Sequence, residues 1–144
     1  MQPDEVLKLE NQLCFPLYAA ARQVVSAYTP YLKPLGLTYT QYIVFLVLWE
    51  KHAVSIRDLC RMLYLDTGTL TPVLKKLESE GYLTRSRSEE DERVVLIELT
   101  EKGTELKESC RSIPGNIGQC FKLSAEEAGA LYTILHKLLS QTED

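Results

Sequence analysis

Apolar residues recur along this chain with mostly helical spacing, and that pattern predicts a mainly α-helical fold. Thr38 with Gln41 and Ser124 with Glu127 fit the capping motif in which two side chains reciprocally satisfy backbone amides at a helix start. Gly81 fits the glycine that commonly follows a helix end. With these signals as limits, the predicted helices span residues 6–32, 39–51, 56–63, 67–80, 101–117 and 125–140.

A small β-hairpin is predicted between the fourth and fifth of these helices. Residues 82–86 and 93–99 flank a polar tip, and Val94, Val95 and Ile97 favour a strand in the second segment. The tip, SRSEEDE, is too long for a two-residue turn, so we expect a protruding loop. A short helix, a turn, a second helix and a hairpin follow one another in the order of a winged helix-turn-helix.

The two helices at 56–63 and 67–80 carry the features of a DNA-reading pair. Their apolar residues predict a shared core of Leu59, Leu63, Leu70, Val73, Leu74 and Leu77. The second helix opens with small hydroxyl residues, which leave backbone amides accessible to a phosphate or a base edge. Lysines follow, and arginines lie along the hairpin. The candidate DNA-binding residues are Asp66, Thr67, Thr69, Thr71, Lys75, Lys76, Arg85, Arg87, Asp91 and Arg93.

The distribution of charge changes what the net charge alone would suggest. The chain has 144 residues, fits a single domain and carries a net charge of −4, which argues against a nucleic-acid partner. Residues 51–87 nevertheless hold seven Lys or Arg against four Asp or Glu, so a basic middle lies within an acidic chain. This local excess favours a polyanion-binding face, with a solvated helix surface as the alternative.

Composition excludes several other classes of protein. Hydrophobic residues make up 45% and charged residues 25%, so the chain is not wholly disordered. No apolar run reaches the length of a membrane helix and the N-terminus lacks an export pattern, so we expect a cytoplasmic protein without membrane contact. In a reducing cytosol, scattered cysteines are typical of buried thiols or a redox site. Zinc spacing is absent, and we expect neither a metal nor another cofactor, from the positions of Cys14, Cys60, Cys110 and Cys120.

Four stretches of the chain resemble MarR-type repressors: LCFPLYAAARQVVSAYTPYL, LGLTYTQYIVFLVLWE, LYLDTGTLTPVLKKLESEGYLTR and RSEEDERVVLIELTEKG. More narrowly, the chain is similar to the OhrR branch, which senses organic hydroperoxides. The resemblance implies one winged-helix domain over residues 1–144 and a homodimer in which residues 1–37 and 101–144 supply interlocking helices. Residues 38–100 would then form the DNA-binding winged helix-turn-helix.

The same resemblance implies how the dimer meets double-stranded DNA. The fourth helix enters the major groove of a pseudo-palindromic operator, and the wing tip reaches the minor groove. Asp91 and Arg93 match the acid–arginine pair of the family's wing tip. Apart from the resemblance, the segments LYTILHKLL and LCFPLYAAARQVV are more apolar than solvent-facing helices of a small domain need, which also favours a dimer.

Cys14 is the candidate redox residue on local grounds. Pro16 marks a helix start or a kink, since proline has no amide to donate and pre-sets the helical φ. The positive partial charge of a helix start favours the thiolate, which is the species that attacks peroxides. Tyr18 lies one turn further along the same face, where its hydroxyl can reach the sulfur. The alternative is that Cys14 is a small buried hydrophobic residue.

Tyr28 is the second candidate partner of the thiol. It lies nearly on the helical face of Cys14 but about 21 Å further along the axis, so in a continuous helix it cannot touch Cys14 of its own chain. An antiparallel partner helix could bring it there. The resemblance implies that arrangement: Cys14 matches the peroxidatic cysteine, Tyr18 its tyrosine from the same chain, and Tyr28 with Tyr39 the tyrosines from the partner. Alternatively, these residues fill the dimer core.

A second thiol is implied by the resemblance to those members that form an intersubunit disulfide. Cys120 falls in the predicted loop before the last helix, where those members carry their second cysteine, and Gly115 and Gly118 would let that loop move. An incidental Cys120, and Cys110 as the resolving partner, are the alternatives. Cys60 is predicted to lie in the core.

Together these features predict a DNA-binding transcriptional repressor and not an enzyme. Organic hydroperoxide would oxidise Cys14 to a sulfenic acid, Cys120 of the partner subunit would condense with it to a disulfide, and the repressor would leave its operator. One alternative is a MarR-type regulator that binds a small aromatic molecule. Another is a thiol peroxidase, although the chain has no Cys-x-x-Cys motif. A purely structural dimer would leave the wing arginines unexplained.

Overall fold

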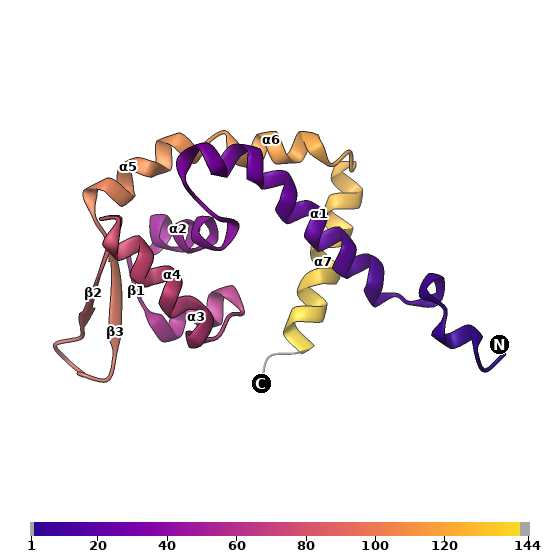
Figure 1. The fold of residues 1–144 in the computed structure, drawn as a ribbon, viewed down its shortest axis with the longest axis horizontal. Helices are drawn as coiled ribbons and strands as arrows, with labels where there is room; N and C mark the ends of the chain where they lie inside the picture. The colour runs from indigo at the N-terminus through magenta and orange to yellow at the C-terminus, as the bar shows by residue number, and fades with distance from the viewer. Residues whose placement is uncertain (1, 142–144) are drawn as a thin grey trace. The chain divides into compact units, whose positions relative to one another are not determined.

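The computed structural model describes residues 2–141, which form helices and a small antiparallel sheet (Figure 1). Residues up to Ile113 make one compact unit and those from Pro114 make a second. The helices are α1 (Cys14–Leu32), α2 (Tyr39–Lys51), α3 (Ile56–Leu63), α4 (Thr67–Ser79), α5 (Glu101–Cys110), α6 (Ile113–Cys120) and α7 (Ala125–Gln141). The strands are β1 (Ala53–Ser55), β2 (Leu83–Arg87) and β3 (Val95–Leu99). Across residues 2–141, none of the helices is both long enough and apolar enough to cross a membrane.

The helices between residues 38 and 80 match their predictions closely because their starts are capped. The backbone N–H of Gln41 donates to Thr38 Oγ1 over 3.2 Å, and that of Thr38 donates to Gln41 Oε1 over 3.0 Å. Ser55 Oγ accepts from the backbone N–H of Asp58 over 3.1 Å at the start of α3. The bounds of α2 and α3 are those expected, and α4 ends one residue early.

The predicted helix over residues 6–32 is wrong at its start, because α1 begins only at Cys14. Two short 3₁₀ turns precede it, and Gln12 between them and α1 is extended, with φ −90° and ψ 124°. The Gln12 side chain donates to the carbonyls of Val6 and Lys8, over 2.8 and 2.7 Å. Pro16 lies in the first turn of α1, where a missing amide costs no hydrogen bond. The proline therefore marks the helix start, and the apolar spacing upstream of it does not extend the helix.

The predicted helix over residues 101–117 is broken at residues 111–112, between α5 and α6. Pro114 explains the break, because it cannot donate to the carbonyl of Cys110 and its ring would clash with that carbonyl in a continuous helix. Since α6 runs on to Cys120, this cysteine is the last residue of a helix and not part of a loop as predicted. Its Sγ donates to the carbonyl of Asn116 over 3.4 Å.

The sheet contains a strand that the sequence did not predict. β1 pairs antiparallel with β3, with Val54 opposite Ile97, and β3 pairs with β2, so the strand order is β1-β3-β2. β1 has three residues between two helices, which is too short for an alternation of apolar and polar side chains to be detected. The predicted hairpin is confirmed to within two residues, since β2 ends at Arg87 and β3 begins at Val95.

The core of the first unit is built from α2, α3, α4 and the sheet, and the β2–β3 hairpin projects beyond these helices (Figure 1). Phe45, Leu48 and Ile97 are fully buried. In the predicted shared core, the residues confirmed as fully buried are Leu59, Leu70, Leu74 and Leu77. The half-buried members of that set are Leu63 and Val73. The two helices of the helix-turn-helix are therefore packed together by their own buried leucines.

Candidate DNA-binding surface and redox-active thiols

The start of α4 is fixed by Asp66, which is its N-cap. Asp66 Oδ1 accepts from the backbone N–H of Thr69 over 2.6 Å, and hydrogen bonds from Thr69 hold the pKa of Asp66 below its usual value. Thr71 Oγ1 donates to the carbonyl of Thr67 over 2.7 Å and so turns back onto the helix. The exposed side chains of the predicted set on α4 are Thr67, Thr69, Lys75 and Lys76.

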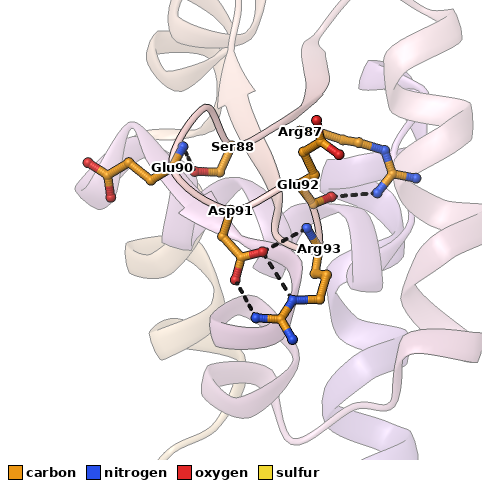
Figure 2. A network of polar contacts seen from close by, with 6 residues as sticks. All are labelled: Arg87, Ser88, Glu90, Asp91, Glu92 and Arg93. Atoms are coloured by element: carbon orange, nitrogen blue, oxygen red, sulfur yellow. Dashed lines mark hydrogen bonds and ion pairs between the residues drawn. The ribbon is translucent and has the colours of Figure 1, made fainter.

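The wing tip is held by a network of polar contacts (Figure 2). Asp91 accepts from the backbone N–H of Arg93 over 3.0 Å, from its Nε over 3.1 Å and from its Nη2 over 3.3 Å. These hydrogen bonds lower the pKa of Asp91, so its carboxylate is charged at neutral pH. Arg87 Nη1 donates to the carbonyl of Glu92 over 2.7 Å. The Arg93 side chain is 90% exposed although it is held, so its guanidinium is presented to solvent in one orientation.

Arg85 differs from Arg87 and Arg93 because its partner, Glu78, lies outside the wing, on α4. Its Nε and Nη2 donate to Glu78 Oε1 over 3.2 and 3.1 Å, and its backbone N–H donates to Glu78 Oε2 over 3.0 Å. The two side chains are 25% and 36% exposed for Arg85 and Glu78, and the pairing lowers the pKa of Glu78. Arg85 therefore joins the last turn of α4 to β2.

A cavity of about 630 Å³ opens between the start of α3, the start of α4 and the wing. Cys60 lines this cavity and is half-buried, so the prediction that it lies in the core is wrong. Its Sγ is 3.8 Å from Thr67 Oγ1. Leu59 takes the buried position on α3, and the next residue points about 100° away from it. Among residues 2–141, no group of three His, Cys, Asp or Glu side chains is placed to hold a metal ion.

Cys14 is the first residue of α1 and is exposed, so of the two alternatives that Pro16 left open, a helix start and a kink, the helix start is the one observed. A thiol buried within its own chain is thereby excluded. Leu13 and Phe15 on either side of it are also exposed. Tyr18, one turn on, is exposed too, and the Arg22 guanidinium lies 5.6 Å from the centre of its ring. The chain thus presents a thiol at the electropositive end of a helix, within an uncovered apolar surface.

Tyr28 of α1 packs in a cluster with Tyr39 and Tyr42 of α2. Its ring centroid lies 4.8 Å from that of Tyr39 and 5.6 Å from that of Tyr42. Burial raises the pKa of all three phenols, that of Tyr42 to about 12, so they are hydrogen-bond donors at neutral pH. α1 runs unbroken from Cys14 to Leu32, which keeps Tyr28 away from Cys14 of its own chain, as predicted. Tyr42 was not predicted, although its position one turn after Tyr39 was a usable signal.

The two candidate resolving thiols differ in their access to solvent. Cys110 is 3% exposed, and burial raises its pKa. It lies close enough to Tyr42 to add to the effect of burial on the pKa of that phenol. Cys120 is exposed at the end of α6. Since a buried, protonated thiol is a poor nucleophile, this difference favours Cys120.

Large apolar side chains are uncovered on α1 and on α7. Phe15 and Val25 of α1 are 43% and 42% exposed. Leu131 and Ile134 of α7 are 45% and 56% exposed, and none of the described residues of α7 is buried. Several large apolar side chains exposed on one helix mark a candidate interaction site in a protein of ordinary composition. These two faces are the segments from which a dimer was predicted.

Comparison with known proteins places this sequence beside transcriptional regulators. The sequence profile of the family described as transcriptional regulator SarA/Rot matches residues 26–110. The organic hydroperoxide resistance transcriptional regulator of Bacillus subtilis (strain 168) is 51% identical over 136 residues, covering 92% of this chain and 92% of that protein.

Solved structures of AbfR, a protein of Staphylococcus epidermidis, have a similar fold. Reduced AbfR bound to DNA aligns with a TM-score of 0.77 and 36% identity, covering 96% of each chain. AbfR with a disulfide formed aligns with a TM-score of 0.63 and 35% identity, covering 96% of this chain and 94% of that chain. The similarity therefore spans nearly the full length of a protein that has been solved in both a DNA-bound and a disulfide state.

Proposed function

This chain belongs to the SarA/Rot family of transcriptional regulators, with the winged-helix fold of MarR-type proteins, and we propose that it is a cytoplasmic, homodimeric repressor that leaves its operator when an organic hydroperoxide oxidises Cys14. It acts by binding double-stranded DNA and not as an enzyme. The exposed thiol at the start of α1 is the observation that carries the proposal.

The oxidation is a two-electron step at the sulfur of Cys14. The thiolate attacks the terminal oxygen of the hydroperoxide, an S–O bond forms while the O–O bond breaks, and the leaving alkoxide takes up a proton to become the alcohol. The product is a sulfenic acid. The thiol of Cys120 of the partner subunit then attacks this sulfur, so that a disulfide forms and water leaves. The apolar side chains exposed beside Cys14 suit the organic part of the oxidant.

The choice of Cys120 as the resolving thiol rests on access. Cys120 is exposed, whereas Cys110 is buried and has a raised pKa, which disfavours its thiolate. The relative AbfR, which has been solved with a disulfide formed, supports a disulfide as the product of oxidation. A sulfenic acid at Cys14 without a resolving thiol would instead persist or proceed to the sulfinic acid at high peroxide.

The tyrosines are proposed to bind the reacting sulfur by hydrogen bonds. In a dimer with antiparallel first helices, Tyr28 of the partner subunit and Tyr39 of the partner subunit approach Cys14, while Tyr18 comes from the same chain. Because burial raises the pKa of Tyr28 and Tyr39, both phenols keep their protons and donate to a thiolate or a sulfenate. Tyr42 holds these two rings in place by packing against them.

The two winged helices are proposed to bind the half-sites of a pseudo-palindromic operator. α4 enters the major groove with its hydroxyl-rich start, and the wing reaches the minor groove with an arginine that Asp91 holds. A covalent link between the dimerisation helices changes the spacing of the two heads, which a two-fold dimer must match to its half-sites. The proposed contacts are Thr67, Thr69, Lys75, Lys76, Arg87 and Arg93.

Serine substitutions of the cysteines test this function. The protein and its Cys14→Ser, Cys110→Ser and Cys120→Ser variants are treated with an organic hydroperoxide, followed by operator-binding titrations and non-reducing electrophoresis with peptide mapping. We expect Cys14→Ser to bind DNA as the parent does and to ignore the oxidant, because serine keeps the size of the side chain but removes the nucleophile. Cys120→Ser should form no covalent dimer.

The half-buried Cys60 supplies the matched control, since Cys60→Ser removes a thiol that the proposal does not use. This variant and Cys110→Ser should respond as the parent does. Release of Cys14→Ser from DNA by hydroperoxide would place the sensor elsewhere. A cross-link that survives Cys120→Ser but disappears in Cys110→Ser would show that Cys110 is the resolving thiol.

A further inference from the structure

Glu78 is an acidic residue on the helix that is proposed to read DNA, and its contacts suggest why it is there. It lies in the last turn of α4, and its side chain is 36% exposed. A carboxylate on a DNA-binding element repels the phosphate backbone unless a nearby cation neutralises its charge. In the structure that cation is Arg85.

The contact holds both the side chain and the backbone of Arg85. Glu78 Oε1 accepts from Nε and Nη2 over 3.2 and 3.1 Å, while Oε2 accepts from the backbone N–H over 3.0 Å. Because the backbone bond fixes the strand itself, the carboxylate sets where β2 lies relative to the end of α4. All of these bonds involve charged groups, and such bonds are stronger than neutral ones.

The strand that Glu78 holds supports the wing tip. Arg85 of β2 is paired with Ile97 of β3, and at the far end of the same ladder Arg87 is paired with Val95. Arg93 lies two residues before β3 begins, so its position follows that of the hairpin. The contact at Arg85 therefore holds the hairpin on the side nearer to α4, and Arg93 lies in the loop at the other end of the hairpin.

We propose that Glu78 is a positioning residue that clamps the wing to α4 through Arg85, so that the start of α4 and Arg93 meet DNA as one rigid unit. Arg85 then contributes to DNA binding through Glu78 and not through a phosphate. The proposal rests on the wing contact proposed above for Arg93.

The sign of the effect of Glu78→Gln separates the clamp from simple electrostatics. This change removes a negative charge and frees Arg85, so charge alone predicts equal or tighter binding to DNA. The clamp predicts the opposite, because the amide cannot replace the charged bonds that hold the wing. We expect the dissociation constant for operator DNA, measured by fluorescence anisotropy on the dimer, to rise about tenfold.

Glu80→Gln is the matched control. It removes the same charge two residues further on, at the C-cap of α4, where the backbone carbonyl and not the side chain holds Lys102. This variant should bind DNA at least as tightly as the parent. Arg85→Lys keeps the positive charge and the backbone bond to Glu78 but cannot donate two side-chain N–H bonds in a fixed fork, so it should weaken binding less than Glu78→Gln does. A larger loss in Arg85→Lys than in Glu78→Gln would show that Arg85 acts on DNA other than through Glu78 and would overturn the clamp.

A double-mutant cycle with Arg93→Ala tests positioning directly. If Glu78 places the wing, Arg93→Ala should weaken binding about tenfold in the parent but less than threefold in the Glu78→Gln background, because the wing is already lost. Equal losses in both backgrounds would overturn the clamp while leaving the wing contact in place. No loss from Arg93→Ala in the parent would remove the wing contact itself, and the clamp with it. Thermal melting monitored by circular dichroism confirms that each variant is folded at the temperature of the titration.

Discussion

The winged helix-turn-helix of residues 38–100 differs from the helices α1 and α7 in how far its apolar side chains are buried. In the winged helix, Phe45, Leu59 and Ile97 are fully buried. In α7, Ile134 is 56% exposed and Leu131 is 45% exposed, and no described residue of that helix is buried. The winged helix therefore completes its core within one chain, whereas α1 and α7 need a second chain to cover theirs.

This difference places the proposed DNA contacts and the proposed sensing thiol in parts of the molecule that are packed differently. The proposed DNA contacts project from a closed core, so their geometry does not depend on the dimer. Cys14 lies at the start of α1 and is exposed, on a face that the proposed dimer would cover. Oxidation of this thiol can rearrange an interface without unfolding the part that reads DNA, and interfaces are where two discrete arrangements commonly occur.

The largest expected effect comes from opening the dimer face, for which Ile134→Ser is the test. Burying one large aliphatic side chain contributes about 1.5–3 kcal/mol, and in a two-fold dimer the change counts twice. The dissociation constant of the dimer, measured by analytical ultracentrifugation, should therefore rise by about a hundredfold or more. Operator binding should weaken with it, because one head alone reads a half-site.

Met62→Ser is the matched control for the dimer face, since Met62 is 39% exposed but lies on α3 of the winged helix. It should leave the dimer intact. If Ile134→Ser remains a dimer at nanomolar concentration, the exposed face of α7 is not part of the interface. The exposure of apolar side chains on α7 would then need another explanation.

A smaller effect is expected from the winged helix itself. Arg93→Ala should weaken operator binding about tenfold by removing the wing contact, with no change in dimerisation or in the rate at which Cys14 is oxidised. Lys75→Ala should weaken binding more evenly across DNA sequences and lower the salt slope by about one, if that lysine meets a phosphate. Titrations against operator and random DNA at several salt concentrations measure both. A changed oxidation rate in Arg93→Ala would show that the two regions are not separable.

The elements that could be predicted are those whose limits are set by neighbouring residues. Thr38 with Gln41 and Ser124 with Glu127 are local pairs, and they mark the starts of α2 and α7 correctly. β1 could not be predicted in this way, because it exists only through its pairing with β3, which is remote in the sequence. The break at Pro114 was readable from the proline but was outweighed by the apolar spacing around it.

The candidate site shows the same division between features set by neighbouring residues and features set by remote ones. Pro16 left a helix start and a kink open near Cys14, and the structure shows the helix start. The engagement of Arg85 by Glu78 was not predicted, because it depends on how the chain folds back between α4 and β2. The proposed approach of Tyr28 and Tyr39 to Cys14 depends on a second chain, so the sequence of one chain implies it only through the family resemblance.

The smallest expected effect comes from removing the N-cap of α4. It tests whether the stability of the winged helix can change without a change in dimerisation. Asp66→Ala should lower the thermal midpoint slightly and leave dimerisation unchanged, whereas Asp66→Asn should retain most of the cap, because an amide oxygen also accepts from Thr69.

The effect of Asp66 on stability should also depend on pH. Since the pKa of Asp66 is lowered from 3.8 in the folded state, its contribution to stability is present above that value and is lost as the pH falls through the lowered pKa. The difference in melting temperature between the parent and Asp66→Ala should therefore be full at neutral pH and shrink in acid. The difference between Asp66→Asn and Asp66→Ala should not change with pH, because neither side chain titrates. Melting curves over a pH series measure both differences, and a parent-to-alanine difference that persists in acid would mean that the charge of Asp66 is not what stabilises the helix start.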